Sequence, residues 1–247
     1  MALRVITKCS VRSSFKTALD QNHVGMLNHR MDNGNIVWWK YRPFILSLGE
    51  HGTYEPTFAT ISKQGTLSCE TVSRKGVVED TAMIKVAACI YPFINFKLAH
   101  YNKKGIENKT IEWQSIINRG DFVVEKPAAY QSNIEQAYAG HLMMLAHAKQ
   151  ILWCSHEPIN LRLAPRTYYL PDFMYLNSDG QLWIDEVKAF RKNKNKAHWE
   201  DDALVKIKVA AELHPYLRFR GVTKKIGTWE YRYFEPQGKF ITERPMA

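Results

Sequence analysis

The chain has few of the features that mark secreted, membrane-embedded or zinc-stabilised proteins. Its 247 residues include four cysteines, Cys9, Cys69, Cys89 and Cys154, and no two are close enough for a Cys-x-x-Cys pair. This spacing argues against a zinc ribbon. The opening residues have no long apolar core typical of a secretory signal, and no apolar run of about 18 residues suggests a transmembrane helix. We therefore expect reduced thiols, no membrane partner and a cytoplasmic location, in the host cell if the protein is viral.

Low-complexity linkers and recognisable internal repeats are also missing from the sequence. Hydrophobic residues make up 45% of the chain and aromatic residues 12%, which is enough for a folded protein with a sizeable core. The formal net charge of +10 favours a polyanionic partner, nucleic acid first. A basic surface without a specific partner would give the same composition.

Residues 1–125 predict an N-terminal α+β region. Strand-like segments cover residues 37–49, and a hairpin joins residues 54–62 to 66–73 through Lys63-Gln64-Gly65. A helix is expected over residues 79–91, where Pro92 would end it. The role of this region stays open between DNA recognition, dimerisation and contact with a partner protein.

Residues 126–247 predict an α/β domain with the order α-β-β-β-α-β-β. Ser132 can cap a first helix whose apolar face runs from Ile134 to Leu152, and Glu135 stands where it completes a capping box. The other elements are strands at 159–163, 168–176 and 181–188, a helix at 200–213, and strands at 216–222 and 229–235.

The most informative stretch is residues 168–188, YYLPDFMYLNSDGQLWIDEVK. Glu186 and Lys188 share one side of a strand because strand side chains alternate with a period of two. Asp172 lies on the preceding strand, so a hairpin would bring it beside Glu186. Two carboxylates can hold a hard cation such as Mg²⁺, and an ammonium beside them can act on water or phosphate.

This arrangement resembles the PD-(D/E)xK nuclease superfamily, with Asp172, Glu186 and Lys188 as the signature residues. The resemblance narrows to phage-type endonucleases, including the Holliday-junction-resolving endonuclease I group, and covers about residues 130–235. It implies a restriction-endonuclease-like core (αβββαβ, a mixed central sheet flanked by helices). It also implies Mg²⁺ or Mn²⁺ bound by Asp172, Glu186 and the Val187 carbonyl. Lys188 would assist the attacking water, and Glu135 would orient a water or a second ion.

The resemblance implies a Mg²⁺-dependent endodeoxyribonuclease of a phage or mobile element. Its partner would be DNA, and a homodimer is one expected assembly. One alternative is a sequence-reading restriction or homing nuclease. Another is a DNA-binding or virion-associated module without turnover. Asp172 could also simply cap a turn, Glu186 and Lys188 could form an ordinary surface pair, and the capping box alone explains Glu135.

A basic loop lies directly beyond the third strand. Its side chains would meet DNA phosphates if the site acts on DNA, although a solvated loop explains them equally well. They are Arg191, Lys192, Lys194, Lys196 and His198.

Overall fold

The computed structural model describes residues 15–73, 77–102, 107–113, 130–191, 196–197, 199 and 201–236. The chain divides into two compact units, Met1–Asn118 and Arg119–Ala247. The boundary expected near residue 125 falls in residues 114–129, outside the described residues. No helix among the described residues is long and apolar enough to cross a membrane.

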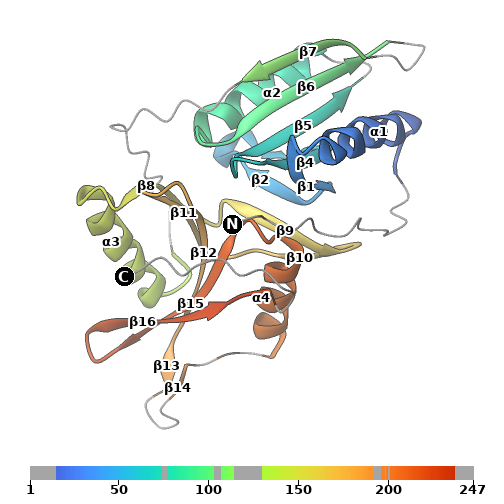
Figure 1. Cartoon of the computed structure of the whole chain (residues 1–247). Coiled ribbons are helices and arrows are strands. Elements are labelled where there is room, and N and C mark those ends of the chain that lie inside the picture. The colour runs from blue at the N-terminus through green and yellow to red at the C-terminus, as the bar shows by residue number, and fades with distance from the viewer. Residues whose placement is uncertain are drawn as a thin grey trace. The chain divides into compact units, whose positions relative to one another are not determined.

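The N-terminal unit is a mixed sheet with two helices (Figure 1). Its sheet has the order β1-β4-β5-β6-β7, in which β5 and β6 run parallel and the other neighbours antiparallel. The elements are α1 (Ala18–Asp32), β1 (Ile36–Tyr41), β4 (Phe58–Ser62), β5 (Leu67–Ser73), α2 (Val77–Ile90), β6 (Asn95–Tyr101) and β7 (Glu107–Trp113). A short hairpin of β2 (Phe44–Ser47) and β3 (Thr53–Tyr54), with a 3₁₀ turn at Gly49–His51, precedes β4.

The C-terminal unit is also a mixed sheet with two helices (Figure 1). Its order is β16-β15-β12-β11-β8, and β12 and β15 are the parallel pair. The elements are α3 (Asn133–His147), β8 (Ile151–His156), β11 (Phe173–Asn177), β12 (Leu182–Lys188), α4 (Asp201–Leu213), β15 (Arg218–Lys225) and β16 (Thr228–Phe234). Two hairpins accompany this sheet, β9 (Ile159–Ala164) with β10 (Thr167–Tyr169) and β13 (Phe190–Arg191) with β14 (Lys196–Ala197).

Local sequence explains the elements that position the C-terminal hairpin. Ser132 caps α3 by accepting a hydrogen bond from the Glu135 N–H. Tyr138 and Leu142 then pack with Phe173 of β11 in the buried core between helix and sheet. The sheet of this unit therefore has an apolar face against α3, which fixes the register of β11 and β12.

Several sequence predictions hold and others need correction. The α/β character is confirmed, and the hairpin predicted over residues 54–73 is present as β4 and β5. The first helix of the C-terminal unit ends at His147, so Leu152 belongs to β8 and not to its apolar face. The segment 168–176 is two strands, because the chain leaves the ladder between Tyr169 and Phe173 at Pro171, which has no N–H to donate.

Two further corrections concern organisation. The strand that flanks β11 is β8, whereas the predicted strand at 159–163 (β9) pairs with β10. The sequence shows no recognisable internal repeat, but the fold does repeat. Both units have the order helix, three sheet strands, helix, two strands, with the same strand order and directions.

Candidate functional site

The β11–β12 hairpin brings the predicted acid and the Glu-Val-Lys strand together. Phe173 pairs with Asp185, so Asp172, one residue before β11, lies beside the end of β12. The Asp172 carboxylate Oδ2 accepts a hydrogen bond of 2.6 Å from the Val187 N–H. The Asp172 carbonyl accepts a second bond, 2.9 Å, from the Glu157 N–H. Backbone N–H groups thus bind both the side-chain carboxylate and the main-chain carbonyl of Asp172.

Glu186 and Lys188 form an ion pair beside this acid. The Lys188 Nζ lies 2.6 Å from Glu186 Oε1, and the Tyr169 hydroxyl donates a bond of 2.8 Å to Glu186 Oε2. Glu186 is 6% exposed, whereas the Lys188 side chain retains 21% of its exposure. A buried carboxylate is costly unless it is paired, and here both of its oxygens are engaged.

Asp172 and Glu186 place two carboxylates close together, and this shifts the pKa of their neighbours. Burial and then the neighbouring Glu186 raise the pKa of Asp172, the Val187 N–H and Lys188 act in the opposite direction, and the net result is a pKa of about 7. Burial and then Glu186 also raise the pKa of Tyr169 well above its usual value, so its hydroxyl stays protonated as a donor. A divalent cation beside Asp172 would favour its charged form.

Glu135 serves its own helix in this structure. Its Oε1 accepts a bond of 2.7 Å from the Ser132 hydroxyl and its Oε2 a bond of 3.1 Å from the Gln131 N–H. His156 Nε2 lies 3.4 Å from the same carboxylate. Half of the capping box predicted from the sequence is present: Ser132 accepts from the Glu135 N–H, but the Glu135 carboxylate binds the Gln131 N–H and the Ser132 hydroxyl in place of the Ser132 N–H. Glu135 is still close enough to contribute, as the smallest named cause, to the raised pKa of Asp172.

The donor set fits a cation that keeps most of its water. Among the described residues, no three His, Cys, Asp or Glu side chains are gathered as a complete metal cage. Mg²⁺ does not need one, because it is commonly held by one or two carboxylates with water completing the shell. Asp172 and Glu186 are two such carboxylates, and the Val187 N–H donates to Asp172.

The sequence analysis missed two groups that support the site. Tyr169 holds Glu186, and its position three residues before Asp172 in the YYLPD segment was the available signal. Asp185 was also missed; it is fully buried and accepts two bonds, 2.7 and 2.9 Å long, from Arg220 of β15 and another from Tyr138 of α3. It lies on the opposite side of β12 from Glu186. Its hydrogen bonds therefore join β12 to α3 and β15 and do not involve Asp172 or Glu186.

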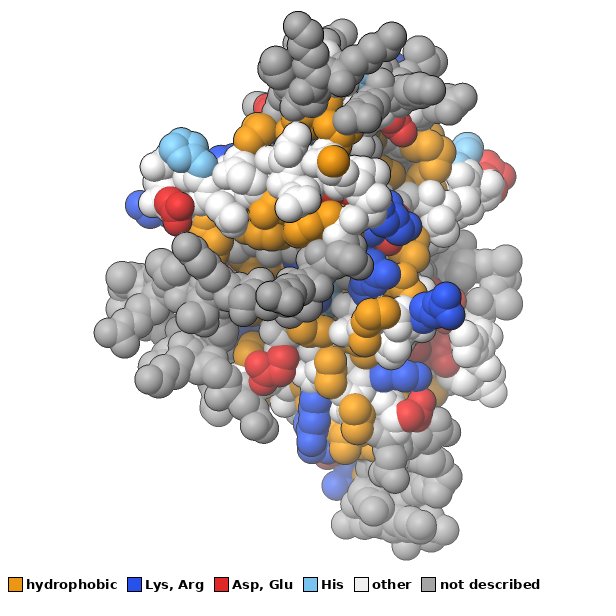
Figure 2. All heavy atoms as spheres, turned by 90° about the vertical axis from the view of Figure 1, so that its right-hand side faces the viewer, with side chains coloured by type: hydrophobic (Ala, Val, Ile, Leu, Met, Phe, Trp, Pro, Cys, Tyr) orange, Lys and Arg blue, Asp and Glu red, His pale blue; other side chains and the backbone are white. Residues whose placement is uncertain are grey.

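The predicted basic loop is only partly visible. Lys192, Lys194 and His198 lie outside the described residues, and Arg191 and Lys196 are described as a backbone pair of β13 and β14. Beyond the loop, the Trp199 ring lies 5.9 Å from the Lys188 Nζ, a cation–π distance. Figure 2 shows Lys and Arg side chains interspersed with acidic and hydrophobic ones on the face that it draws.

Comparisons with protein-family models, with curated proteins and with solved structures return no match for this chain.

Proposed function

We propose that the protein is a Mg²⁺-dependent endodeoxyribonuclease whose site is built from Asp172, Glu186 and Lys188. The observation that carries this proposal is the close packing of the three groups. Asp172 binds the Val187 N–H, and the residues on either side of Val187 are the Glu186–Lys188 ion pair. A surface pair or a turn cap would not account for two partly desolvated carboxylates placed against each other.

Each residue has a separate chemical task. Asp172, Glu186 and the Val187 carbonyl would hold the cation, which supplies Lewis-acid stabilisation of the negative charge that grows on the phosphate. Lys188 would position or deprotonate the attacking water, or balance charge on the phosphate. Tyr169 keeps Glu186 oriented through its hydroxyl. Glu135 would assist by orienting water only after release from its cap.

Two coarser features also support the proposal. The order α3-β8-β11-β12-α4-β15, with β12 and β15 parallel, agrees with the αβββαβ core of the nuclease superfamily that the sequence resembles. The net charge of +10 suits a phosphate-rich substrate, with DNA rather than RNA inferred from that resemblance.

The test is cleavage of a four-way junction, a branched DNA and a linear duplex with and without Mg²⁺. We expect Asp172→Ala to lower the initial rate by at least about 100-fold, since even groups that only support a metal ligand contribute 10–100-fold. Lys188→Ala should lower it by about 10²–10⁴-fold, the range for a group that moves a proton. Asp179→Ala, at the exposed turn of the same hairpin, is the matched control.

The substrate that is cut fastest separates the remaining alternatives. Preference for the junction indicates a resolvase-like enzyme, and cutting at fixed sequences in the duplex indicates a restriction or homing type. DNA binding by a folded wild type that cuts none of the substrates would contradict the proposal and favour the module without turnover.

A further inference from the structure

The two units repeat one another element by element. α1, β1, β4 and β5 correspond to α3, β8, β11 and β12, and each begins and ends 115 positions before its counterpart. The strand pairings agree as well: two antiparallel pairs lead to one parallel pair, formed across a helix, and then to another antiparallel pair. Agreement in length, order and direction over four consecutive elements is more than two unrelated α/β sheets require.

The same 115-position register carries identical residues through the hairpin that holds the site. No gap is needed between residues 54–73 and 169–188. Tyr54, Pro56, Phe58, Gly65, Leu67 and Val72 recur as Tyr169, Pro171, Phe173, Gly180, Leu182 and Val187. Gly65 and Gly180 each occupy the turn with a positive φ, 86° and 79°, which favours glycine at both positions.

Irregular backbone is repeated in the same register. Arg42 and Glu157 are non-glycine residues with φ values of 44° and 47°. Their N–H groups donate to the carbonyls of Thr57 and Asp172, and both bonds are 2.9 Å long. Left-handed backbone at non-glycine residues is uncommon, so its recurrence at corresponding positions is specific.

The register shifts after the hairpin. Glu70 pairs with Lys97 across the parallel strands, and Asp185 pairs with Arg220, so β6 and β15 are spaced by 123 positions instead of 115. The last strands, β7 and β16, are spaced by 121 positions. The C-terminal unit therefore has eight more residues between its parallel strands. They fall between β12 and β15, in the part of the chain that contains β13, β14 and the basic loop.

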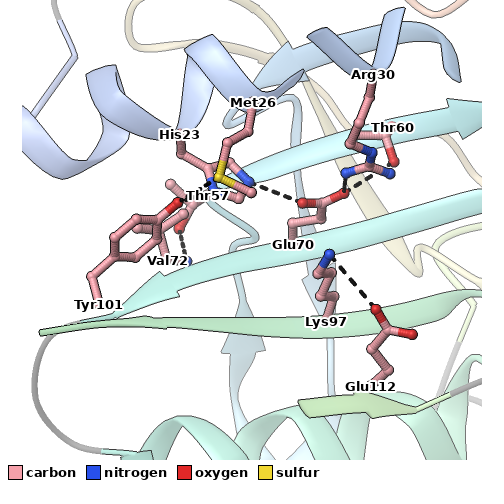
Figure 3. Close-up of polar contacts among 10 residues, drawn as sticks. All are labelled: His23, Met26, Arg30, Thr57, Thr60, Glu70, Val72, Lys97, Tyr101 and Glu112. Atoms are coloured by element: carbon pink, nitrogen blue, oxygen red, sulfur yellow. Dashed lines mark hydrogen bonds and ion pairs between the residues drawn. The ribbon is translucent and has the colours of Figure 1, made fainter. Parts of the chain in front are cut away.

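A buried acid is kept at the same place in both cores. In the N-terminal unit the acid is Glu70, which binds His23 of α1 (2.9 Å) and Arg30 (Figure 3). In the C-terminal unit it is Asp185, which binds Tyr138 at the corresponding position of α3. Each acid fastens the first helix to the third sheet strand, so the shared architecture includes its polar interior.

The three site positions differ in charge between the two units. Thr57, Thr71 and Ser73 stand where the C-terminal unit has Asp172, Glu186 and Lys188. Thr57 Oγ1 accepts a bond of 3.1 Å from the Val72 N–H, as Asp172 does from Val187, and Figure 3 shows this contact. Thr71 shares a bond of 2.6 Å with the Tyr54 hydroxyl, as Glu186 does with Tyr169. The frame is retained, but neutral hydroxyls replace the charges.

We propose that residues 17–113 are a second copy of the fold of residues 132–234 that has no metal ligands, so that one chain carries one cleavage site and cuts one DNA strand per binding event. This inference rests on the proposed function. Enzymes that cut both strands at once need a second site, commonly from the second subunit of a symmetric dimer. Here a second unit is already in the chain, but its three hydroxyl side chains cannot replace two carboxylates and an ammonium.

Each event is a hydrolysis of one phosphodiester. The oxygen of one water molecule forms a bond to phosphorus as one P–O ester bond breaks. The water gives up a proton and the leaving oxygen gains one. The products are one phosphate monoester end and one hydroxyl end on the same strand, while the opposite strand stays intact.

Supercoiled plasmid with limiting protein and Mg²⁺ tests the strand count. We expect open circles to accumulate first and linear molecules to form only after the supercoiled substrate is consumed. Linear product that forms from the start, at the same rate as open circles, would overturn the inference. A wild type that cuts neither plasmid nor branched DNA would instead overturn the proposed function on which it rests.

A Mn²⁺ titration of the full chain counts ligand sets without relying on cleavage. We expect Asp172→Asn/Glu186→Gln to abolish Mn²⁺ binding, and Thr57→Ala/Thr71→Ala, the matched change in the other unit, to leave it unchanged. Mn²⁺ binding that survives the first double variant, with folding verified by circular dichroism, would overturn the single-site assignment. Thr57→Asp/Thr71→Glu/Ser73→Lys should add Mn²⁺ binding that persists when combined with the first variant.

Discussion

Tyr169 is the side chain whose contribution can be isolated most cleanly. Its hydroxyl donates 2.8 Å to Glu186, and Tyr54 makes the equivalent bond to Thr71 in the other unit. We expect Tyr169→Phe to lower metal affinity and cleavage by about 10–100-fold, the usual cost of losing a group that orients a ligand. Each variant also loses one hydrogen bond, which should lower stability by about 0.5–1.5 kcal/mol, and Tyr54→Phe should do so without a change in cleavage rate.

Cleavage rates and Mn²⁺ titrations of the two tyrosine variants would check this prediction. An equal loss of activity in both variants would show that the effect comes from folding rather than from the orientation of Glu186.

Glu70 makes stability depend on acid pH. Burial disfavours its charge, but the hydrogen bond with His23 and the charge of Arg30 outweigh burial and lower its pKa to about 2. The Thr60 hydroxyl also donates to this carboxylate, over 3.4 Å. Because the folded pKa lies below the usual value of 4.5, the stabilisation is complete above about pH 4.5 and is lost as the pH falls toward 2.

Urea denaturation of wild type and Glu70→Gln at several pH values measures this contribution. We expect wild type to have the higher unfolding midpoint by a constant margin above pH 4.5, and the margin to shrink steadily below it. A margin that stayed constant down to pH 2.5 would contradict a carboxylate held in its charged form.

At the scale of elements, Gly221 sets how closely β15 and Trp199 approach. A Cβ at this position would lie 2.1 Å from the Trp199 ring, so any larger residue must displace the indole. We expect Gly221→Ala to destabilise the protein by about 1–3 kcal/mol, as overpacking does. Gly140→Ala on α3, where no atom lies within 4 Å of an added Cβ, should cause no loss.

Denaturation of Gly221→Ala, Trp199→Ala and the double variant would check this packing. In the Trp199→Ala background, Gly221→Ala should lower the free energy of unfolding only slightly. If the losses of the two single variants add up fully in the double variant, the contact is contradicted.

The Asp185–Arg220 pair joins β12, β15 and α3. Both residues are largely buried, and the Arg220 guanidinium also lies 4.1 Å from the centre of the Tyr231 ring. Asp185→Ala should destabilise the protein by about 3–5 kcal/mol, because it leaves a buried guanidinium without its acid. Thermal unfolding measures the loss. The change should be much smaller for Lys225→Ala, whose ion pair with Glu230 is more exposed.

At the scale of the whole molecule, the proposed function makes the net charge of +10 the main source of DNA affinity. If the protein neutralises 6–10 phosphates, its affinity should fall by about 10³–10⁵-fold between 50 and 200 mM salt. Fluorescence anisotropy with Asp172→Asn in the absence of divalent cations isolates binding from cleavage. Affinity that is independent of salt would contradict phosphate contact as the main source of binding.

The sequence by itself determined the local parts of this protein. The hairpin around Lys63-Gln64-Gly65 and the alternation along residues 182–188 predicted real strands, because strand period and turn chemistry act over a few residues. The same locality brought Asp172, Glu186 and Lys188 into one hypothesis. Helix α1 was missed because its buried positions include Asp20 and His23, which give it almost no apolar face.

Only the tertiary structure decided the long-range relations. Arg220 reaches Asp185 through parallel pairing across a helix, a contact between residues 35 positions apart. Tyr169 lies within the 168–188 stretch, but only the packing of the β9–β10 hairpin shows that its hydroxyl binds Glu186. The repeat was hidden for a related reason. The buried frame has the same residues at positions such as Pro56 and Phe58, where packing restricts the choice, whereas most of the other corresponding positions differ. The few identical residues relate the two units only once the three-dimensional structure has fixed their register.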